Sequence, residues 1–179
     1  MTTTIALFHG VLTEFEADVI VHAANGSLLS DTGDEGAVHR VGGPEIVAEI
    51  QRIREVKFTD GLPAGQVVST NAGNLPAKWV VHTVAPAFDE ENVKTLRACY
   101  TEAVDLADKL GAFTIALPVL GLGVHGWPIE DAVRHAVDAI ASTESHLTTA
   151  TFVVESDEVY AALTTAVEAR VSDSHAEAV

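Results

Sequence analysis

The chain has 179 residues with a formal net charge of −16 at pH 7, and 47% of its residues are hydrophobic. A chain of this length and apolar content can bury one core, so we expect a single folded domain over residues 1–171 and a flexible polar tail over 172–179. The acidic balance disfavours direct nucleic-acid binding, which needs clustered Lys and Arg. The absence of any uninterrupted apolar run of about 18 residues excludes a helical membrane span.

Cysteine usage and the start of the chain bear on the compartment. The one cysteine, Cys99, excludes an internal disulfide and falls on the apolar face of a predicted helix, where we expect a small core residue. The first residues, Met1 to Thr4, lack the basic segment of a secretory signal. These features predict a cytoplasmic protein.

Short apolar runs alternate with amphipathic segments along the chain. Strands are predicted at 4–8, 18–22, 66–70, 79–83, 114–118 and 150–154, because β-branched and aromatic residues dominate there between Gly, Pro and Asn. Helices are predicted at 44–54, 92–110, 129–141 and 157–170, and another is expected to open near Asp34. Strands separated by helices of this length predict parallel pairing with right-handed crossovers. The first strand either follows this rule or pairs antiparallel at an edge.

The second predicted strand carries polar residues to its carboxyl end. It leads into Asn25, and after a loop a helix follows with Glu35 and His39 four residues apart, on one helical face. Open parallel sheets bind ligands at the carboxyl ends of their strands, so an amide, a carboxylate and an imidazole converge where a ligand would lie. On the residue alone, Asn25 is either a ligand-binding amide or a turn residue, because Asn-Gly commonly ends a strand.

A second candidate segment is the glycine-rich loop after the fifth predicted strand. Gly121, Gly123 and Gly126 would let backbone N–H groups approach a phosphate, and the helix that follows adds positive potential at its N-terminus. No HxH or HExxH spacing is present among the histidines, so no metal site is predicted.

Five stretches resemble a known family in colinear order. They are Gly10–Thr13, His22–Asn25, Glu35–Pro44, Asn74–Pro86 and Pro118–Pro128. They are similar to the GDIT, NAAN, DGAIHRAAG, NLPAKYVIHTVGP and PxxSTGxYGFP stretches of the macrodomain family. The resemblance covers about residues 5 to 165, nearly the whole chain.

The resemblance implies a macrodomain-like three-layer α/β/α fold with a mixed, mostly parallel central sheet. It implies ADP-ribose or an ADP-ribosylated protein as the partner, with no cofactor. By this resemblance Asn25 contacts the ribose beside the scissile bond, Glu35 orients the catalytic water, and His39 supports Glu35. Asp34 is the alternative acid if the loop register differs. The remaining ligand-binding positions are Val11, Leu12, His22, Ala24, Gly33, Asp34, Gly121, Leu122, Gly123, Val124, His125 and Gly126.

Several positions depart from the family pattern, and Val11, His22 and Glu35 are three of them. Val11 stands where the family has the Asp that recognises the adenine amino group, and valine cannot accept that hydrogen bond. His22 replaces the first Asn of NAAN, and Glu35 replaces an Asp with a carboxylate one methylene longer. The favoured hypothesis is an ADP-ribosyl hydrolase, and the alternatives are a non-catalytic ADP-ribose reader and a nucleotide-binding scaffold with altered base specificity.

Overall fold

A six-stranded sheet forms the centre of the chain, in the order β1-β6-β5-β2-β4-β3. In the computed structural model, the described residues are 3–28 and 33–176, and among these the side chains of 33–35 and 173–176 are not described. The strands are β1 Thr4–His9, β2 Val19–Ala23, β3 Val67–Asn71, β4 Trp79–Thr83, β5 Thr114–Leu117 and β6 Thr149–Val154.

Strand β1 lies at one edge of the sheet and pairs parallel with β6, which answers the question that the sequence left open. The antiparallel strand is β3, at the opposite edge, where it pairs with β4. Residues 72–78, between these two strands, contain no helix, so the chain reverses direction there instead of crossing over. The sheet is therefore mixed and mostly parallel, as the sequence predicts.

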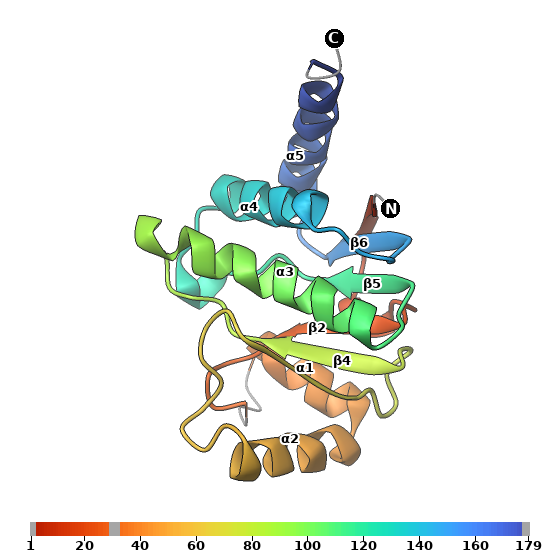
Figure 1. Cartoon of the computed structure of the whole chain (residues 1–179), viewed down its shortest axis with the longest axis vertical. Helices are drawn as coiled ribbons and strands as arrows, with labels where there is room; N and C mark the ends of the chain where they lie inside the picture. The colour runs from red at the N-terminus through yellow and green to blue at the C-terminus, as the bar shows by residue number, and fades with distance from the viewer. Residues whose placement is uncertain (1–2, 29–32, 177–179) are drawn as a thin grey trace.

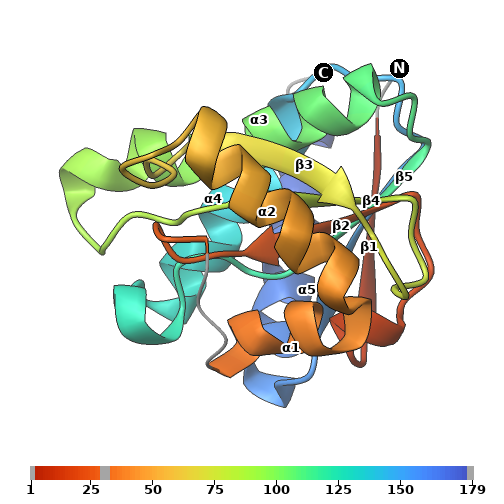
Figure 2. The same cartoon turned by 90° about the horizontal axis from the view of Figure 1, so that it is seen from below.

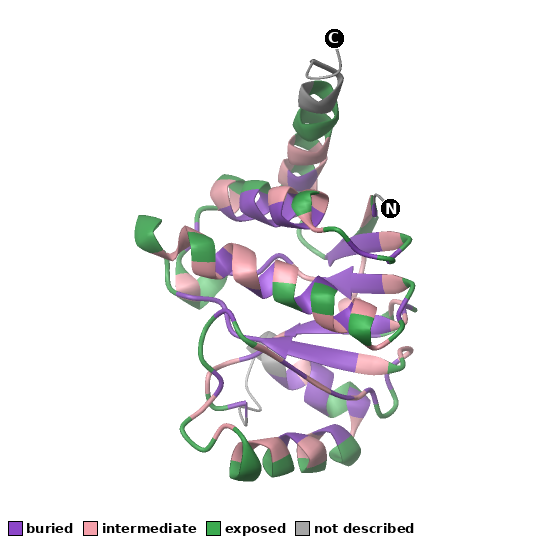
Figure 3. Ribbon diagram, in the orientation of Figure 1, coloured by how far each residue is buried: buried purple, intermediate pink, exposed green. Residues whose placement is uncertain are grey.

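Helices cover both faces of this sheet, which gives three layers (Figures 1 and 2). Helices α1 (Gly33–Gly42) and α2 (Pro44–Val56) pack on one face. Helices α3 (Val93–Lys109), α4 (Ile129–Ser142) and α5 (Asp157–Ala176) pack on the other. Strands covered on both faces are buried along their length, and Figure 3 shows this for the central strands.

Helix α5 differs most from its predicted extent. The sequence predicts a helix over 157–170 and a polar tail from residue 172, whereas the helical backbone continues to Ala176. No Gly or Pro follows Arg170 to end the helix. The last turns of α5 extend away from the sheet (Figure 1), so packing against the core is not what keeps them helical.

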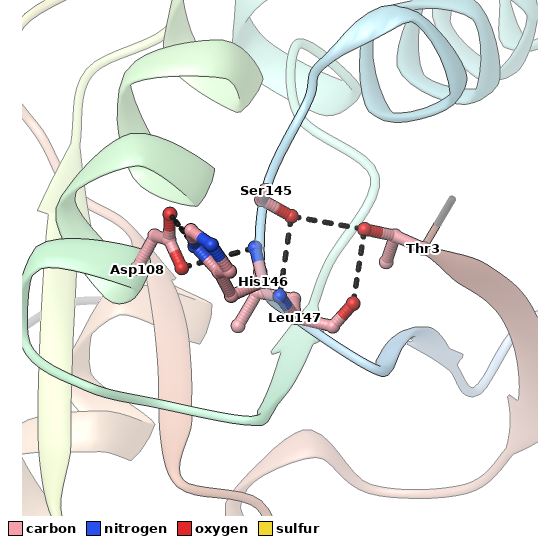
Figure 4. A network of polar contacts seen from close by, with 5 residues as sticks. All are labelled: Thr3, Asp108, Ser145, His146 and Leu147. Atoms are coloured by element: carbon pink, nitrogen blue, oxygen red, sulfur yellow. Dashed lines mark hydrogen bonds and ion pairs between the residues drawn. The ribbon is translucent and has the colours of Figure 1, made fainter. Parts of the chain in front are cut away.

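The connection between α4 and β6 is fixed by a polar network at the amino end of the sheet (Figure 4). Asp108, near the end of α3, accepts hydrogen bonds from the His146 amide and lies 3.1 Å from His146 Nδ1. This bond lowers the pKa of the Asp108 carboxyl below its ordinary value. Ser145 meets the Thr3 hydroxyl at 2.9 Å, and Thr3 also donates to the Leu147 carbonyl. The network joins the start of β1, the end of α3 and the segment before β6. It lies at the amino ends of the strands, and the carboxyl ends take no part in it.

Asp18 joins three strands at the same amino edge. Its carboxylate accepts hydrogen bonds from the amides of Phe113 and Thr114 and pairs with Lys78 at 2.8 Å. Its carbonyl accepts from the amides of Lys78 and Trp79. The bond from Lys78 and the two amide bonds lower the pKa of the Asp18 carboxyl. One residue thus aligns the starts of β2, β4 and β5.

We predict that Asp18→Ala lowers the free energy of unfolding by about 2 kcal/mol, because it strands two backbone amides that donate to a charged acceptor. Urea unfolding at pH 7 measures the change. Glu16→Ala removes an exposed acid two residues away and serves as the control, with an expected change within about 0.5 kcal/mol. Equal stabilities for the two variants would contradict this role of Asp18.

Candidate functional site

The carboxyl ends of the parallel strands gather the predicted site residues at one edge of the sheet. Val11 and Leu12 follow β1, Asn25 follows β2, and the segment 121–126 follows β5. Because β1, β2 and β5 all run in the same direction, these segments emerge side by side. Helix α1 begins at Gly33 on the chain that leaves β2. The structure therefore brings together the positions that the sequence selects from distant parts of the chain.

Asn25 makes the hydrogen bonds of a turn residue. Its Oδ1 accepts from the Leu28 amide at 3.1 Å and from the Ser27 hydroxyl at 2.5 Å. The Leu28 amide can only donate, so it identifies the side-chain oxygen and fixes which way the amide group is turned. Nδ2 donates to no residue that the structure describes, so Asn25 offers a donor, not an acceptor, to a ligand.

Leu28 holds this turn in an uncommon conformation. Its φ of 61° lies in the left-handed region, where a non-glycine side chain is strained. The side chain is buried in the core cluster beneath α1 and α2, together with Val38 and Ile46. Core packing therefore compensates for the strain at the turn, a feature that the sequence pattern did not reveal.

The structure describes the backbone of the two acids at the start of α1, Asp34 and Glu35. Asp34 and Glu35 lie in the first turn of the helix that opens at Gly33, where the helix dipole favours a carboxylate. Their side chains are outside the described part of the chain, as are residues 29–32 of the preceding loop. The predicted role of Glu35 thus remains a prediction.

Several predicted site residues, among them Ala24, His22 and His39, lie inside the protein instead of on its surface. Ala24 is buried, and its amide donates to the Thr83 carbonyl, so its side chain belongs to the core. His22 is also buried, with its Nδ1 2.9 Å from Nδ1 of His82 on β4. His39 packs its ring edge-on against His22, with centroids 5.4 Å apart. Burial lowers the pKa of His82 well below its ordinary value, and His22 and His39 lower it further.

The glycine-rich loop offers a row of backbone donors. Along residues 122–124, no described residue accepts a hydrogen bond from the backbone amides. The loop includes a 3₁₀ turn over Gly123–His125, and Val124 at its tip is 97% exposed. Gly126 then adopts a left-handed conformation, with φ at 77°. Successive unpaired N–H groups at a strand end form a concave site for an anion.

Trp127 holds this loop from below. Its indole Nε1 donates to the Pro86 carbonyl at 2.9 Å, and its ring meets Phe88 edge-on. The Phe88 amide donates to the His125 carbonyl at 2.7 Å. The segment after β4 and the loop after β5 are therefore one unit. The support of the loop by Trp127 was not predicted from the sequence. The available signal was a Trp immediately after the glycine-rich loop.

The loop also meets the core at its start. The Tyr100 hydroxyl of α3 accepts a hydrogen bond from the Leu120 amide at 2.7 Å. Burial raises the pKa of this phenol, so Tyr100 stays neutral. A neutral hydroxyl keeps the strand end fixed without adding a negative charge beneath a site for anions.

The opposite end of the site is apolar. Val11 precedes a 3₁₀ turn over Leu12–Glu14, and Leu12 packs against the core cluster on the α1 and α2 face. The Gly10 amide is bonded to the Val154 carbonyl, which joins the ends of β1 and β6. Val11 has no side-chain acceptor, so it cannot bind an amino group as the resemblance implies for this position.

Within the described chain, no group of three or more His, Cys, Asp and Glu side chains could hold a metal ion. None of the described helices combines the length and apolarity that crossing a bilayer requires.

Comparison with known proteins agrees with this geometry. The Macro domain family model matches residues 21–136, which include the Asn25 turn, α1 and the glycine-rich loop. The chain belongs to the macrodomain family. A macro domain-containing protein of Streptomyces coelicolor is 45% identical over 162 residues, covering 89% of this chain and 96% of that protein.

Two further similar proteins have an ADP-ribose compound in their name or were solved with one. O-acetyl-ADP-ribose deacetylase 1 of Pantoea vagans is 40% identical, covering 76% of this chain and 80% of the relative. A mutant of the Oceanobacillus iheyensis macrodomain, solved with ADPR, superposes with a TM-score of 0.90 at 29% identity. That comparison covers 96% of this chain and 95% of the other.

We predict that Gly121→Ala destabilises the macrodomain more than Gly111→Ala, although both glycines have positive φ. A Cβ at Gly121 would lie 2.6 Å from Trp127 Cδ1, whereas a Cβ at Gly111 meets nothing within 4 Å. Backbone strain costs about 1 kcal/mol at either position, and displacement of Trp127 adds about 1–3 kcal/mol at Gly121. Urea unfolding of the two variants checks this, and equal losses would show that Trp127 does not constrain the loop.

Buried histidines predict a dependence of stability on pH. The pKa values of His82 and His135 are lowered by burial, so the unfolded chain binds protons near pH 6.5 that the folded chain does not. The free energy of unfolding should fall as pH decreases from 7 to 5, above the range in which Asp18 titrates. Urea titrations of the unaltered protein, His82→Gln and the control His125→Gln measure the slope. Only His82→Gln should flatten it, and a slope unchanged in that variant would contradict the assignment.

Proposed function

We propose that this macrodomain binds ADP-ribose and hydrolyses an ester that links its terminal ribose to an acyl group or an acidic protein side chain. Water adds across the ester bond, which gives a carboxylic acid and a free ribose hydroxyl. The single observation that carries the proposal is the row of backbone amides at 122–124, which donate to no described residue and lie at the same end of the sheet as the Nδ2 donor of Asn25.

The diphosphate is assigned to the glycine-rich loop. A net charge of −16 makes general attraction of an anion unfavourable, so local donors must supply the binding energy. The amides of 122–124 provide these donors without side-chain cations, and Trp127 holds them in place before the ligand arrives. Preorganised donors of this kind lose little conformational entropy on binding.

The terminal ribose is assigned to the segment that joins β2 to α1. Asn25 has its side-chain oxygen engaged in the turn, so Nδ2 is held ready to donate to a ribose hydroxyl oxygen. Glu35 lies in the first turn of α1, where it orients the attacking water in this proposal. Catalysis then depends on positioning and electrostatics.

The relatives support an acyl ester as the first substrate to test. Proteins of Pantoea vagans and Citrobacter koseri that are 40% and 38% identical to this chain carry the name O-acetyl-ADP-ribose deacetylase. The structural neighbour that contains ADPR supports the same nucleotide. An ADP-ribosylated Glu or Asp side chain presents the same ester chemistry in a protein.

A non-catalytic reader of ADP-ribose is the second candidate. Glu35 at the position of the family's Asp favours it, because an additional methylene shifts the carboxylate relative to the water. Val11 favours a broader choice of base in either case, since it lacks an acceptor for an amino group. Hydrolysis and binding therefore have to be measured separately.

Two substitutions at Asn25 separate its turn from its donor. Asn25→Asp keeps the acceptor for Leu28 and Ser27 but removes the N–H donor, whereas Asn25→Ala removes both. We predict that each lowers the turnover of O-acetyl-ADP-ribose about tenfold or more, while only Asn25→Ala also destabilises the protein, by about 1 kcal/mol. Release of acetate and urea unfolding are the two measurements.

The control is Ser27→Ala, which removes one bond of the turn and leaves Asn25 in place; its turnover should stay within about threefold of the unaltered protein. Calorimetry with ADP-ribose is run in parallel on the unaltered protein. Binding without release of acetate, or of ADP-ribose from an ADP-ribosylated protein, at excess enzyme would refute the hydrolase and leave the reader. Failure to bind at millimolar ADP-ribose would refute both.

A further inference from the structure

A row of buried polar side chains crosses the sheet directly beneath helix α1. Thr70 of β3, His82 of β4 and His22 of β2 lie on three adjacent strands, and all are nearly inaccessible to solvent. His22 pairs in register with His82 across the parallel strands. The surrounding cluster is apolar, built around Ile20 and Val80 of the same strands. A hydrogen-bonded polar row in such a layer constrains its neighbours strongly, because any broken bond leaves a buried polar group unsatisfied.

The hydrogen bonds give this row a direction. The Thr70 hydroxyl donates its one proton to the Asn71 carbonyl and lies 2.9 Å from His82 Nε2. It must therefore accept from His82, which places the His82 proton on Nε2 and leaves Nδ1 as an acceptor. His22 Nδ1 lies 2.9 Å from that atom and so carries the proton of the shared bond. Nε2 of a neutral His22 is then the acceptor nitrogen of the ring.

The row admits one proton between the two Nδ1 atoms. A charged His82 would carry N–H groups on both nitrogens and face the Nδ1–H of His22, so two donors would meet at 2.9 Å. The titratable groups that bear on His82 are His22 beside it and His39 above it. Glu49 of α2 lies next to the row but outside it, where its carboxylate accepts from the amide of Asn71, the residue after Thr70. A proton added to His82 would therefore force His22 out of its Nδ1–H tautomer.

His39 connects the row to the site. Its ring packs edge-on against His22 from α1, four residues after Glu35 in the same helix. His22 itself lies three residues before Asn25 on β2. The orientation of one imidazole thus affects both the helix that carries the proposed water-orienting acid and the strand that delivers the ribose donor.

We propose that Thr70 and His82 are positioning residues that hold His22 as its Nδ1–H tautomer, and that His22 in this form seats His39 and helix α1 for catalysis. The proposal rests on the hydrolase function proposed above. Neither Thr70 nor His82 contacts the substrate; they act through His22. Without the Thr70 hydroxyl, nothing in the row fixes which nitrogen of His82 and His22 carries the proton, although both imidazoles remain.

The first test reads the tautomers directly. In ¹⁵N-detected imidazole spectra of the unaltered protein at pH 7.5, His22 should show a protonated Nδ1 and a bare Nε2, and His82 the reverse. Spectra of His22→Asn and His82→Gln assign the two rings by loss of signal. In Thr70→Val both rings should leave these pure tautomers, and in Thr70→Ser, which keeps the hydroxyl, they should retain them. A bare Nδ1 on His22 in the unaltered protein, or unchanged spectra in Thr70→Val, would overturn the proposal.

The second test measures turnover of O-acetyl-ADP-ribose by the same variants. Thr70→Val should lower kcat roughly three- to tenfold with KM within about twofold, and Thr70→Ser should restore kcat. The acid limb of the kcat profile should also shift in Thr70→Val, because loss of the Thr70 hydroxyl changes the free energy of protonating His82. An unchanged kcat and pH profile beside altered tautomers would refute the positioning role.

The two proposals can fail separately. If the unaltered protein shows no turnover but has the expected tautomers, the hydrolase fails. The seating of α1 is then read from the His39 imidazole shifts, which Thr70→Val should displace and Thr70→Ser should not. If turnover is present but the tautomers are reversed, the hydrolase stands and the positioning network is refuted.

Discussion

Strand β2 is constrained on every side, and the rest of the structure depends on that constraint. It pairs with β4 along one edge and with β5 along the other, and Val19, Ile20 and Val21 are completely buried between the two helical layers. Asp18 fixes its amino end to both neighbours. The strand cannot slip by one residue without exchanging the side chains of the two cores. The position of Asn25 at its carboxyl end is therefore set by the packing of the whole sheet.

The two halves of the site are built in different ways. In the proposed function, the side that follows β5 binds through backbone amides, so binding there would not depend on the side chains of Leu122 and His125. The side that follows β2 uses specific side chains, with Asn25 in a strained turn and His39 on a buried polar row. Substitutions in the chain should thus change chemistry on the β2 side more readily than anion binding on the β5 side.

Much of the fold could be predicted because the hydrophobic periodicity of each segment agrees with the residues that mark its ends. The helices α2, α3 and α4 begin and end within two residues of the predicted segments, since each has a clear apolar face and a boundary residue. The direction of β1 could not be predicted, because its partner β6 lies more than 140 residues away and no local pattern records that pairing. The end of α5 was missed because a polar segment without Gly or Pro is equally compatible with a solvated helix.

The candidate site was predicted as a set of positions but not as a set of contacts. Short motifs located Asn25, His39 and the glycine-rich loop, since glycine and asparagine mark the ends of strands. The pairing of His22 with His82 depends on the register of β2 and β4, and the support of the loop by Trp127 depends on the segment after β4. Such contacts join residues 41 to 60 positions apart, so a linear pattern cannot show them.

The arrangement of Trp127 also provides this macrodomain with an optical probe. The chain has two tryptophans, and the other, Trp79, begins β4 at the amino edge of the sheet, away from the amides of the glycine-rich loop. Trp127 is buried with its indole nitrogen bonded to Pro86, and its ring touches the loop at Gly121. Any ligand that shifts this loop alters the surroundings of one fluorophore and leaves the other as an internal reference. Binding of a ligand at this loop can thus be followed by intrinsic emission, without a label on protein or nucleotide.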